Sequence, residues 1–589
     1  MNQHLVYSAG DIVNFLECEH HVALDFMDLE TPLPKAASNE ELRLIQDKGQ
    51  AHEKSYAEKL KFEYERYEDI EQASTSLSGR LQATLEAVQS GADIIYQPSL
   101  QNGTLFGTPD FLRKVSRPSD LGDFSYEVLD TKLALSVKTK FIIQLAFYSR
   151  ILGTVQGIEP LFMHVILGDQ QEVSFACKDS SRYLQQLLKR FEQRLQSWNV
   201  TRKEIEQTYP DPCPHCAVCE WLDLCEERRL RDDHLCQVAG ITKNQIAKLT
   251  AAGITSLESL GRLEAKSRIP GLAPQTLEKI ADQAALQLKA RQTGDNHLEL
   301  LTLDEEQKRG FFRLPRPSPG DMFFDMEGDP LEEGGLEYLF GLYFFDQENP
   351  VFKSFWAHDR SQEKTAFEAF MDFITARFQV YPEAHIYHYA HYEVTALKKL
   401  MSLHGTRETE VDNLLRAGTL IDLYKVVRES LRVSEPSYSI KNLEHFYMEK
   451  RTGDIQDAGA SIVFYEHWKA TADHSLLQKI EDYNLDDVRS TFELRQWLLS
   501  LRPPGLPWAD EQDHEEIEPV SMGQMTEHEQ RIAEYRQILV DPLPEDRACW
   551  QTQEFLQELT WQLLDFYRRS DKPQWWAMFS RMETAAEEL

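Results

Sequence analysis

Four of the eight cysteines in this chain fall within thirteen residues, in the segment CPHCAVCEWLDLC at 213–225. Thiols this crowded are typical of a metal site rather than of disulfides. The last three are separated by gaps of two and five residues, which suit either zinc or an iron–sulfur cluster, because both accept thiolate ligands. The segment therefore predicts a metal centre at the end of the domain that precedes it.

The length of 589 residues is too great for one hydrophobic core. At roughly 100–200 residues per domain, about three to five domains are expected. Two proline-bearing polar stretches, RLPRPSPG ending at Gly320 and the segment 502–520, interrupt the periodic patterns. The expected divisions are 1–230, 231–295, 320–501 and a helical tail at 523–589.

The net charge is −34, which argues against a protein that coats nucleic acid with a broadly basic surface. It does not exclude an enzyme that grips a strand in one basic groove. The N-terminus lacks the basic and apolar regions of a signal peptide, and no apolar run approaches the ~18 residues of a membrane helix. We therefore expect a cytoplasmic protein that does not enter a membrane.

Residues 1–230 mix helical and strand-like patterns, which predicts an α/β core. The segment YEVLDTK places Asp130 and Lys132 two residues apart on a strand, so both side chains face the same way. Asp110 ends an earlier strand-like run. Hydrolysis of a phosphodiester with two metal ions needs converging carboxylates, and a lysine can stabilise the developing charge. The pattern predicts a first acidic site.

Four motifs in this region resemble those of RecB-like nucleases of the PD-(D/E)XK superfamily. They are KGQAHE with His52, GTPD with Asp110, DTK with Asp130 and Lys132, and QLAFY with Gln144 and Tyr148. The resemblance implies a PD-(D/E)XK fold in which His52, Asp110 and Asp130 bind Mg²⁺ or Mn²⁺. Lys132, Gln144 and Tyr148 would complete the catalytic site.

Some RecB-like relatives carry one early cysteine and three late ones that bind a 4Fe–4S cluster. Cys18, Cys216, Cys219 and Cys225 resemble that arrangement, which leaves Cys213 over. The resemblance implies an iron–sulfur cluster on those four residues. A compact zinc site that uses Cys213 with the other three late cysteines explains the local spacing equally well.

Residues 231–295 contain short helical segments punctuated by Gly-Ile and Pro-Gly-Leu, where glycine ends one helix and turns into the next. The region resembles tandem helix-hairpin-helix modules, whose backbone amides often contact a phosphate backbone. The alternative is a helical linker that packs the two halves of the chain together.

The segment FFDMEGD places Asp325 and Glu327 on one face of an apolar strand. Carboxylates that emerge from such a strand are more often ligands than solvated decoration. Glu393 begins a helix after the strand-like AHIYHYA, and Tyr483 and Asp487 share one face of another helix through their i, i+4 spacing. Three strands followed by alternating helices and strands predict an RNase H-like fold.

These residues resemble the three motifs of DEDD exonucleases of the type with a tyrosine in the third motif. Asp325 and Glu327 match the first motif, Tyr483 and Asp487 match the third, and Glu393 stands where the second has aspartate. The resemblance implies that the four carboxylates bind Mg²⁺ or Mn²⁺ and that Tyr483 orients the attacking water. The neighbouring Asp422 and Asp486 would support this set.

The complete arrangement resembles a family of RecB-like nucleases with a cysteine cluster, a hairpin bridge and an RNase H-like exonuclease domain. Members of that family often continue into a superfamily 1 helicase. The resemblance implies a DNA nuclease with two acidic sites and a possible helicase partner. An RNA-processing nuclease and a largely inactive adaptor that recruits a helicase are the alternatives. The aromatic-rich tail is expected to be a docking element.

Overall fold

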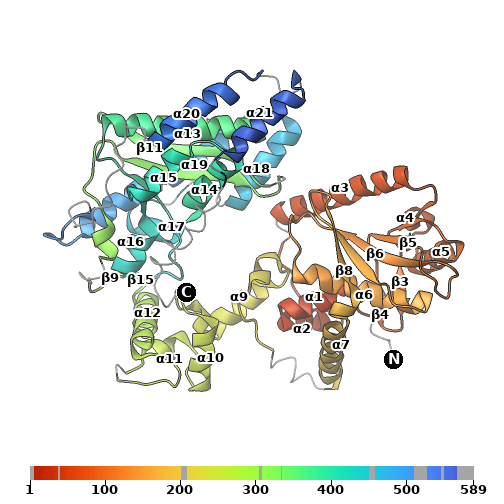
Figure 1. Cartoon of the computed structure of the whole chain (residues 1–589). Coiled ribbons are helices and arrows are strands. Elements are labelled where there is room, and N and C mark those ends of the chain that lie inside the picture. Colours follow the sequence, from red (N-terminus) through yellow and green to blue (C-terminus); the bar gives the residue numbers. More distant parts are fainter. Residues whose placement is uncertain are drawn as a thin grey trace.

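The computed structural model describes residues 6–37, 40–200, 208–264, 266–303, 308–332, 334–449, 451, 455, 458–509, 527–544, 549–564 and 566. These residues form mixed α/β domains, and helices α9 to α12 lead from the N-terminal one to the C-terminal one (Figure 1). Across these ranges, every helix is too short or too polar to span a membrane.

The N-terminal domain is built on a six-stranded sheet with the order β1-β2-β5-β6-β7-β8. Strands β6 and β7 are parallel, so the chain crosses over between them through helix α6. Every residue of β6 is buried, as expected for a strand that is covered on both faces. The strands are β1 (Tyr67–Asp69), β2 (Ile94–Tyr96), β5 (Phe111–Val115), β6 (Ser125–Thr131), β7 (Phe162–Ile166) and β8 (Glu172–Ala176), and β3 (Leu100–Asn102) and β4 (Leu105–Gly107) form a separate hairpin.

Helices cover both faces of this sheet, because successive strand residues point to opposite sides. Ile94 and Leu129 pack against helix α3, whereas Ile95 and Val128 pack in the larger cluster that contains α1, α6 and α7. The helices of this domain are α1 (Ala9–Glu17), α2 (Glu19–Asp28), α3 (Glu40–Glu63), α4 (Ile70–Ala73), α5 (Leu77–Ser90), α6 (Thr139–Gln156) and α7 (Cys177–Val200).

The hairpin region has its own small apolar core and packs on the C-terminal domain. Gln283 of α12 donates a hydrogen bond of 2.8 Å to the carbonyl of Val433, and Arg432 pairs with Asp282 at 3.0 Å. Its elements are η1 (Pro214–Val218), α9 (Leu222–Arg231), η2 (Leu235–Gln237), α10 (Lys243–Ala251), α11 (Leu257–Gly261) and α12 (Pro274–Thr293), followed by β9 (Leu298–Leu300), which pairs with β15 (Leu431–Val433).

The C-terminal domain contains a five-stranded sheet with the order β12-β11-β10-β13-β14. Its central strand β10 is antiparallel to β11 and parallel to β13. Helices α13, α14 and α15 pack on one face, and α16, α17 and α19 on the other. The strands are β10 (Met322–Asp329), β11 (Leu336–Asp346), β12 (Asn349–Trp356), β13 (Ile386–His388) and β14 (Leu420–Asp422). The helices are α13 (Arg360–Val380), α14 (Tyr392–His404), α15 (Glu408–Arg416), α16 (Leu423–Ser430), α17 (Ile440–Leu443), α18 (Ala458–Thr471) and α19 (His474–Leu501), with the 3₁₀ turns η3 (Gly310–Arg313) and η4 (Glu444–Phe446).

The segment before β10 is more than a polar linker. Phe311 and Leu314 are buried in the core of the C-terminal domain, beneath α16 and α19. The two apolar residues hold the segment rich in arginine and proline, RLPRPSPG, against the domain. The folded unit therefore begins before Gly320.

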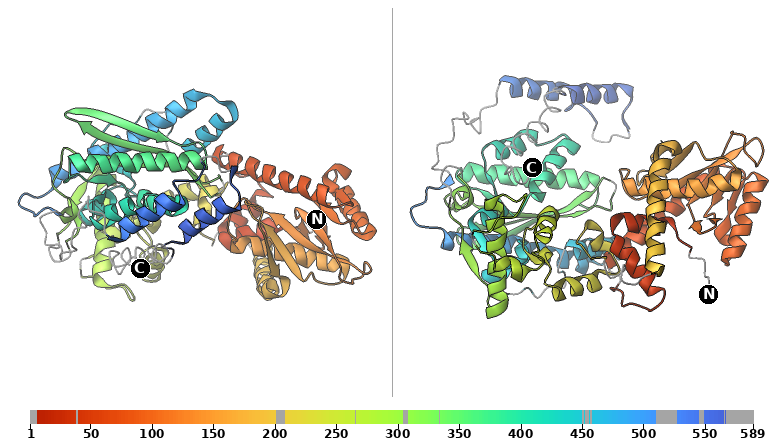
Figure 2. Two further views of the ribbon diagram at one scale, coloured as in Figure 1. Left: turned by 45° about the horizontal axis from the view of Figure 1, so that its top comes forward. Right: turned by 90° about the horizontal axis from the view of Figure 1, so that it is seen from below.

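Helix α3 of the N-terminal domain contacts α18 of the C-terminal domain, where Nζ of Lys48 lies 2.8 Å from a carboxylate oxygen of Glu466. The tail helices α20 (Glu527–Leu539) and α21 (Thr552–Leu563) lie along the outside of the C-terminal domain (Figure 2). Phe555 and Leu559 of α21 are half exposed. Trp575 and Trp576, which contribute to the expected docking element, lie outside the described residues.

Candidate nuclease sites and the thiol centre

Three of the predicted carboxylates converge in the C-terminal domain. Oxygens of Asp325, Glu327 and Asp487 lie within 4.8 Å of one another. The first two point from β10 toward the face covered by α19, the side on which Phe323 packs, and α19 supplies Asp487. Three acids at this separation repel one another strongly unless a cation lies between them.

Asparagine and glycine hold Asp325 in position. Nδ2 of Asn484 donates a hydrogen bond of 2.8 Å to Asp325. Gly341 lies opposite Asp325 on β11, and a Cβ at that position would lie 1.7 Å from Oδ1 of Asn484. Only glycine therefore leaves room for the Asn484 amide beside the carboxylate.

Two basic residues approach the same carboxylates. Lys441 of α17 donates a hydrogen bond of 3.0 Å to the hydroxyl of Tyr483, which is 5% exposed. Arg451 lies 2.6 Å from Asp487 and also pairs with Glu444. The two side chains therefore place positive charge beside the acidic group.

Burial dominates the electrostatics of this acidic group. It raises the pKa of Glu327 to about 8, and the negative charge of Asp487 adds to the increase. Burial and the charges of Asp487, Glu327 and Glu393 raise the pKa of Asp325 well above its ordinary value. Protons or metal ions are therefore needed to hold these acids together.

Glu393 approaches this group but is not part of the close trio. It is 3% exposed at the start of α14, and its Oε2 lies 3.5 Å from Nδ1 of His388. Asp422 instead caps α16 and accepts a hydrogen bond of 3.0 Å from the backbone of Ala390, just before α14. Asp422 thus shapes the loop that presents Glu393.

The predicted acids of the N-terminal domain also meet. The backbone amide of Asp110 donates a 3.3 Å hydrogen bond to Asp130, and Oδ2 of Asp110 accepts bonds of 2.7 Å from both the amide and the hydroxyl of Thr131. Lys132 pairs with Asp130. Burial raises the pKa of Asp110, and the charges of Asp130 and Glu53 raise it further. Burial opposes the charge on Lys132, but the two aspartates outweigh it and raise its pKa.

Two neighbours on helix α3 point in different directions. Glu53 accepts a hydrogen bond of 2.5 Å from Gln97, whose side chain also reaches Asp110 at 3.4 Å. His52 instead lies against the backbone of Ile166 and Leu167. Glu53 rather than His52 is therefore the residue of this pair whose charge acts on Asp110.

The remaining motif residues form one wall of this site. Nε2 of Gln144 donates a hydrogen bond of 3.1 Å to the hydroxyl of Tyr148 on α6. A Cβ at Gly107 would lie 2.5 Å from the Tyr148 ring, so the glycine of GTPD allows β4 to approach α6. The QLAFY and GTPD segments therefore pack directly against each other.

The predicted cysteine ligands gather around one small cavity. Cys18 lies between α1 and α2, and the late cysteines come from η1 and α9. Besides thiols, the wall contains His21, His215 and Arg229. The thiols that line it are Cys18, Cys213, Cys216, Cys219 and Cys225. The structure thus brings together all four residues predicted for a cluster, together with the fifth cysteine.

The family model of the RNase H superfamily matches residues 322–499. The C-terminal domain is RNase H-like. The fold predicted for 320–501 is therefore confirmed over this range, and an RNase H-like domain indicates nuclease-type activity on nucleic acid. No curated protein matches the chain.

Sequence reasoning missed several residues that border the RNase H-like carboxylates. Asn484 directly follows the predicted site residue Tyr483, so the sequence places it near the site. Its hydrogen bond to Asp325, and the space that Gly341 leaves for it, are visible only in the structure. Lys441 lies on the four-residue helix α17 and Arg451 lies outside any helix or strand, so neither belongs to a segment long enough to show a periodic pattern. In the N-terminal domain, Glu53 directly follows the predicted ligand His52 in KGQAHE, and the motif resemblance gives it no role.

Proposed function

We propose that the chain is a metal-dependent nuclease that hydrolyses phosphodiester bonds in DNA, with one acidic site in each half. The observation that supports this most directly is the convergence of Asp325, Glu327 and Asp487 within an RNase H-like domain. RNA is the alternative substrate, because a shared fold does not fix the polymer.

At the RNase H-like site, Asp325, Glu327 and Asp487 would hold Mg²⁺ or Mn²⁺, with Glu393 beside them. When bound, such ions activate water and neutralise charge on the leaving oxygen. Because Lys441 donates to the oxygen of Tyr483, the phenolic proton is left to orient the water.

Arg451 has two acidic partners in this structure, Asp487 and Glu444. If Asp487 were a metal ligand instead of a partner of Arg451, one side of the guanidinium would be available to donate to two phosphate oxygens. We therefore assign Arg451 to substrate binding rather than to the metal ligands.

At the N-terminal site, we propose that Asp110, Asp130 and Glu53 hold the metal ion and that Lys132 stabilises charge on the scissile phosphate. The motif resemblance adds His52 as a ligand, although its ring lies against the backbone at the end of β7. Gln144 and Tyr148 would position the substrate. The proposed fold of this domain is the PD-(D/E)XK fold of RecB-like nucleases.

The thiol centre is proposed to be structural. Five cysteines around one cavity fit a metal centre, either the 4Fe–4S cluster on Cys18, Cys216, Cys219 and Cys225 or a zinc ion bound by late cysteines. We also propose that the tail at 523–589 docks a helicase. Its deletion should spare hydrolysis of short oligonucleotides, and a loss of catalysis in a folded protein would contradict this.

The decisive experiment compares Asp130→Ala, Asp487→Ala and the double variant on labelled single- and double-stranded DNA and RNA, with Mg²⁺ or Mn²⁺. Each single variant should retain one cleavage pattern, and the double variant should retain none. The matched controls are Asp123→Ala and Asp482→Ala, which alter one exposed acid in each of the two domains.

If Asp130→Ala abolishes all hydrolysis, the RNase H-like domain is a scaffold. If neither single variant changes hydrolysis, both assignments fail and an adaptor becomes the better description. Glu393→Asp tests the second motif, since the shorter side chain should change the preference between Mg²⁺ and Mn²⁺ if Glu393 contacts the metal.

A further inference from the structure

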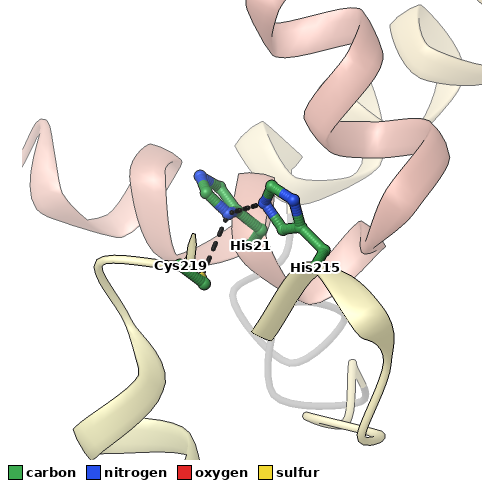
Figure 3. Close-up of side chains that lie close together, drawn as sticks. All are labelled: His21, His215 and Cys219. Atoms are coloured by element: carbon green, nitrogen blue, oxygen red, sulfur yellow. Dashed lines mark hydrogen bonds between the residues drawn. The ribbon is translucent and has the colours of Figure 1, made fainter. Parts of the chain in front are cut away.

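Two histidines and a cysteine beside the thiol cavity point their donor atoms toward a common centre (Figure 3). Nδ1 of His21 lies 3.1 Å from Nε2 of His215 and 3.3 Å from Sγ of Cys219. His21 belongs to α2, whereas the other two residues lie in and immediately after η1. The three donor atoms lie within 4.8 Å of one another, and no three thiols in the described ranges do so.

These distances match the edges of a tetrahedral zinc site. Zinc binds imidazole nitrogen at about 2.0–2.1 Å and thiolate sulfur at about 2.3 Å, which gives edges of about 3.3 Å between two nitrogens and about 3.6 Å between nitrogen and sulfur. The observed separations of 3.1 and 3.3 Å are each shorter by only a few tenths of an ångström.

Hydrogen bonding alone explains the arrangement poorly. Nδ1 of His21 has one lone pair or one proton, yet it faces both His215 and Cys219. The opposite nitrogen, Nε2, lies 3.1 Å from the side-chain amide nitrogen of Asn14 and 3.3 Å from Oδ2 of Asp25, and Asp25 accepts a 2.8 Å hydrogen bond from Trp221. A carboxylate that accepts from Nε2 leaves the lone pair on Nδ1 available to a metal, as in many metal-binding histidines.

We infer that His21, His215 and Cys219 bind one zinc-class divalent ion through Nδ1, Nε2 and Sγ, and that Asp25 orients His21. This takes Cys219 out of the four-cysteine set proposed above and leaves Cys18, Cys213, Cys216 and Cys225 as the remaining thiols. The site goes beyond the nuclease function and does not depend on it.

The first test is metal analysis and zinc-edge X-ray absorption on the full chain produced with ample zinc and iron. We expect one zinc per chain at this site, bound by two imidazole nitrogens and at least one sulfur. A zinc bound by four sulfurs and no nitrogen would overturn the inference in favour of a compact cysteine site. A chain that contains no zinc and takes up none on addition of Zn²⁺ would also overturn it.

Variants at His215 make the test specific to this residue. His215→Cys should keep the zinc and replace one nitrogen by one sulfur, whereas His215→Ala should lower zinc affinity by at least tenfold. The matched control is His445→Ala, which removes a half-exposed histidine that pairs with Glu435. Zinc coordination that is unchanged in His215→Cys would refute the ligand assignment, even if His215→Ala fails to fold.

Discussion

Replacing Gly341 by alanine should disturb the RNase H-like site without touching a carboxylate. The added Cβ would lie 1.7 Å from Oδ1 and 2.8 Å from Cγ of Asn484, and 3.2 Å from a ring carbon of Phe352. Asn484 is fully buried within α19, so its amide must move by more than an ångström to restore ordinary contact. That movement would break its hydrogen bond to Asp325.

Two costs combine in this variant. Overpacking a well-filled core costs about 1–3 kcal/mol, and losing a hydrogen bond to a charged group costs about 1.5–3 kcal/mol. A chain with several domains does not unfold in one step, so native-state hydrogen exchange in β11 and α19 is the appropriate measurement. We expect the opening free energy there to fall by about 2.5–6 kcal/mol. Hydrolysis by the C-terminal site, measured in an Asp130→Ala background, should fall with it.

Gly49→Ala, in helix α3, is the matched control. A Cβ at Gly49 would meet only a methyl group of Leu133, at 3.9 Å. Glycine to alanine in a helix interior is expected to stabilise by about 0.5–1 kcal/mol. If Gly341→Ala changes the opening free energy by less than about 0.5 kcal/mol, the packing argument around Asn484 is wrong.

Three further predictions follow from charges. Glu53→Gln should silence the N-terminal site as fully as Asp130→Ala, whereas Glu58→Gln, on the exposed side of α3, should leave hydrolysis unchanged. The folded state raises the pKa of Glu327 from 4.5 to about 8, so without metal the opening free energy of the C-terminal domain should fall between those pH values. Mn²⁺ should suppress the fall, and an opening free energy that is the same at both pH values would contradict this prediction. Lys48→Glu should separate α3 from α18, which would be measured as a larger radius of gyration. Adding Glu466→Lys to that variant should restore the ion pair and the original radius.

The sequence was most informative where a short period places side chains on one face. The alternation of β10 predicts that Asp325 and Glu327 point the same way, and the helical repeat does the same for Tyr483 and Asp487. The sequence pattern could not show which of two adjacent helix residues faces the site. His52 and Glu53 point about 100° apart around α3, and only the packing of α3 on the sheet directs Glu53 toward Asp110.

Contacts between distant segments were beyond such reasoning. Lys441 reaches Tyr483, and His215 reaches His21 across 194 residues, because of tertiary folding that no local pattern encodes. The same holds for Phe311 and Leu314, whose burial depends on the helices that cover them. The RNase H-like fold was nevertheless predictable, because three strands in succession followed by alternating helices and strands leave few arrangements open.

The contact between α2 and the segment after α7 has a consequence for the newly made chain. Cys219 lies 198 residues after His21, so at about 5–20 residues per second a ribosome needs about 10–40 s to deliver the second half of this centre after the first. Throughout that interval α2 lacks the segment around Trp221 and Cys225, against which Leu24 packs. Cys18 must therefore remain reduced during synthesis, and conditions that oxidise nascent thiols should lower the yield of folded protein more than they affect the finished molecule.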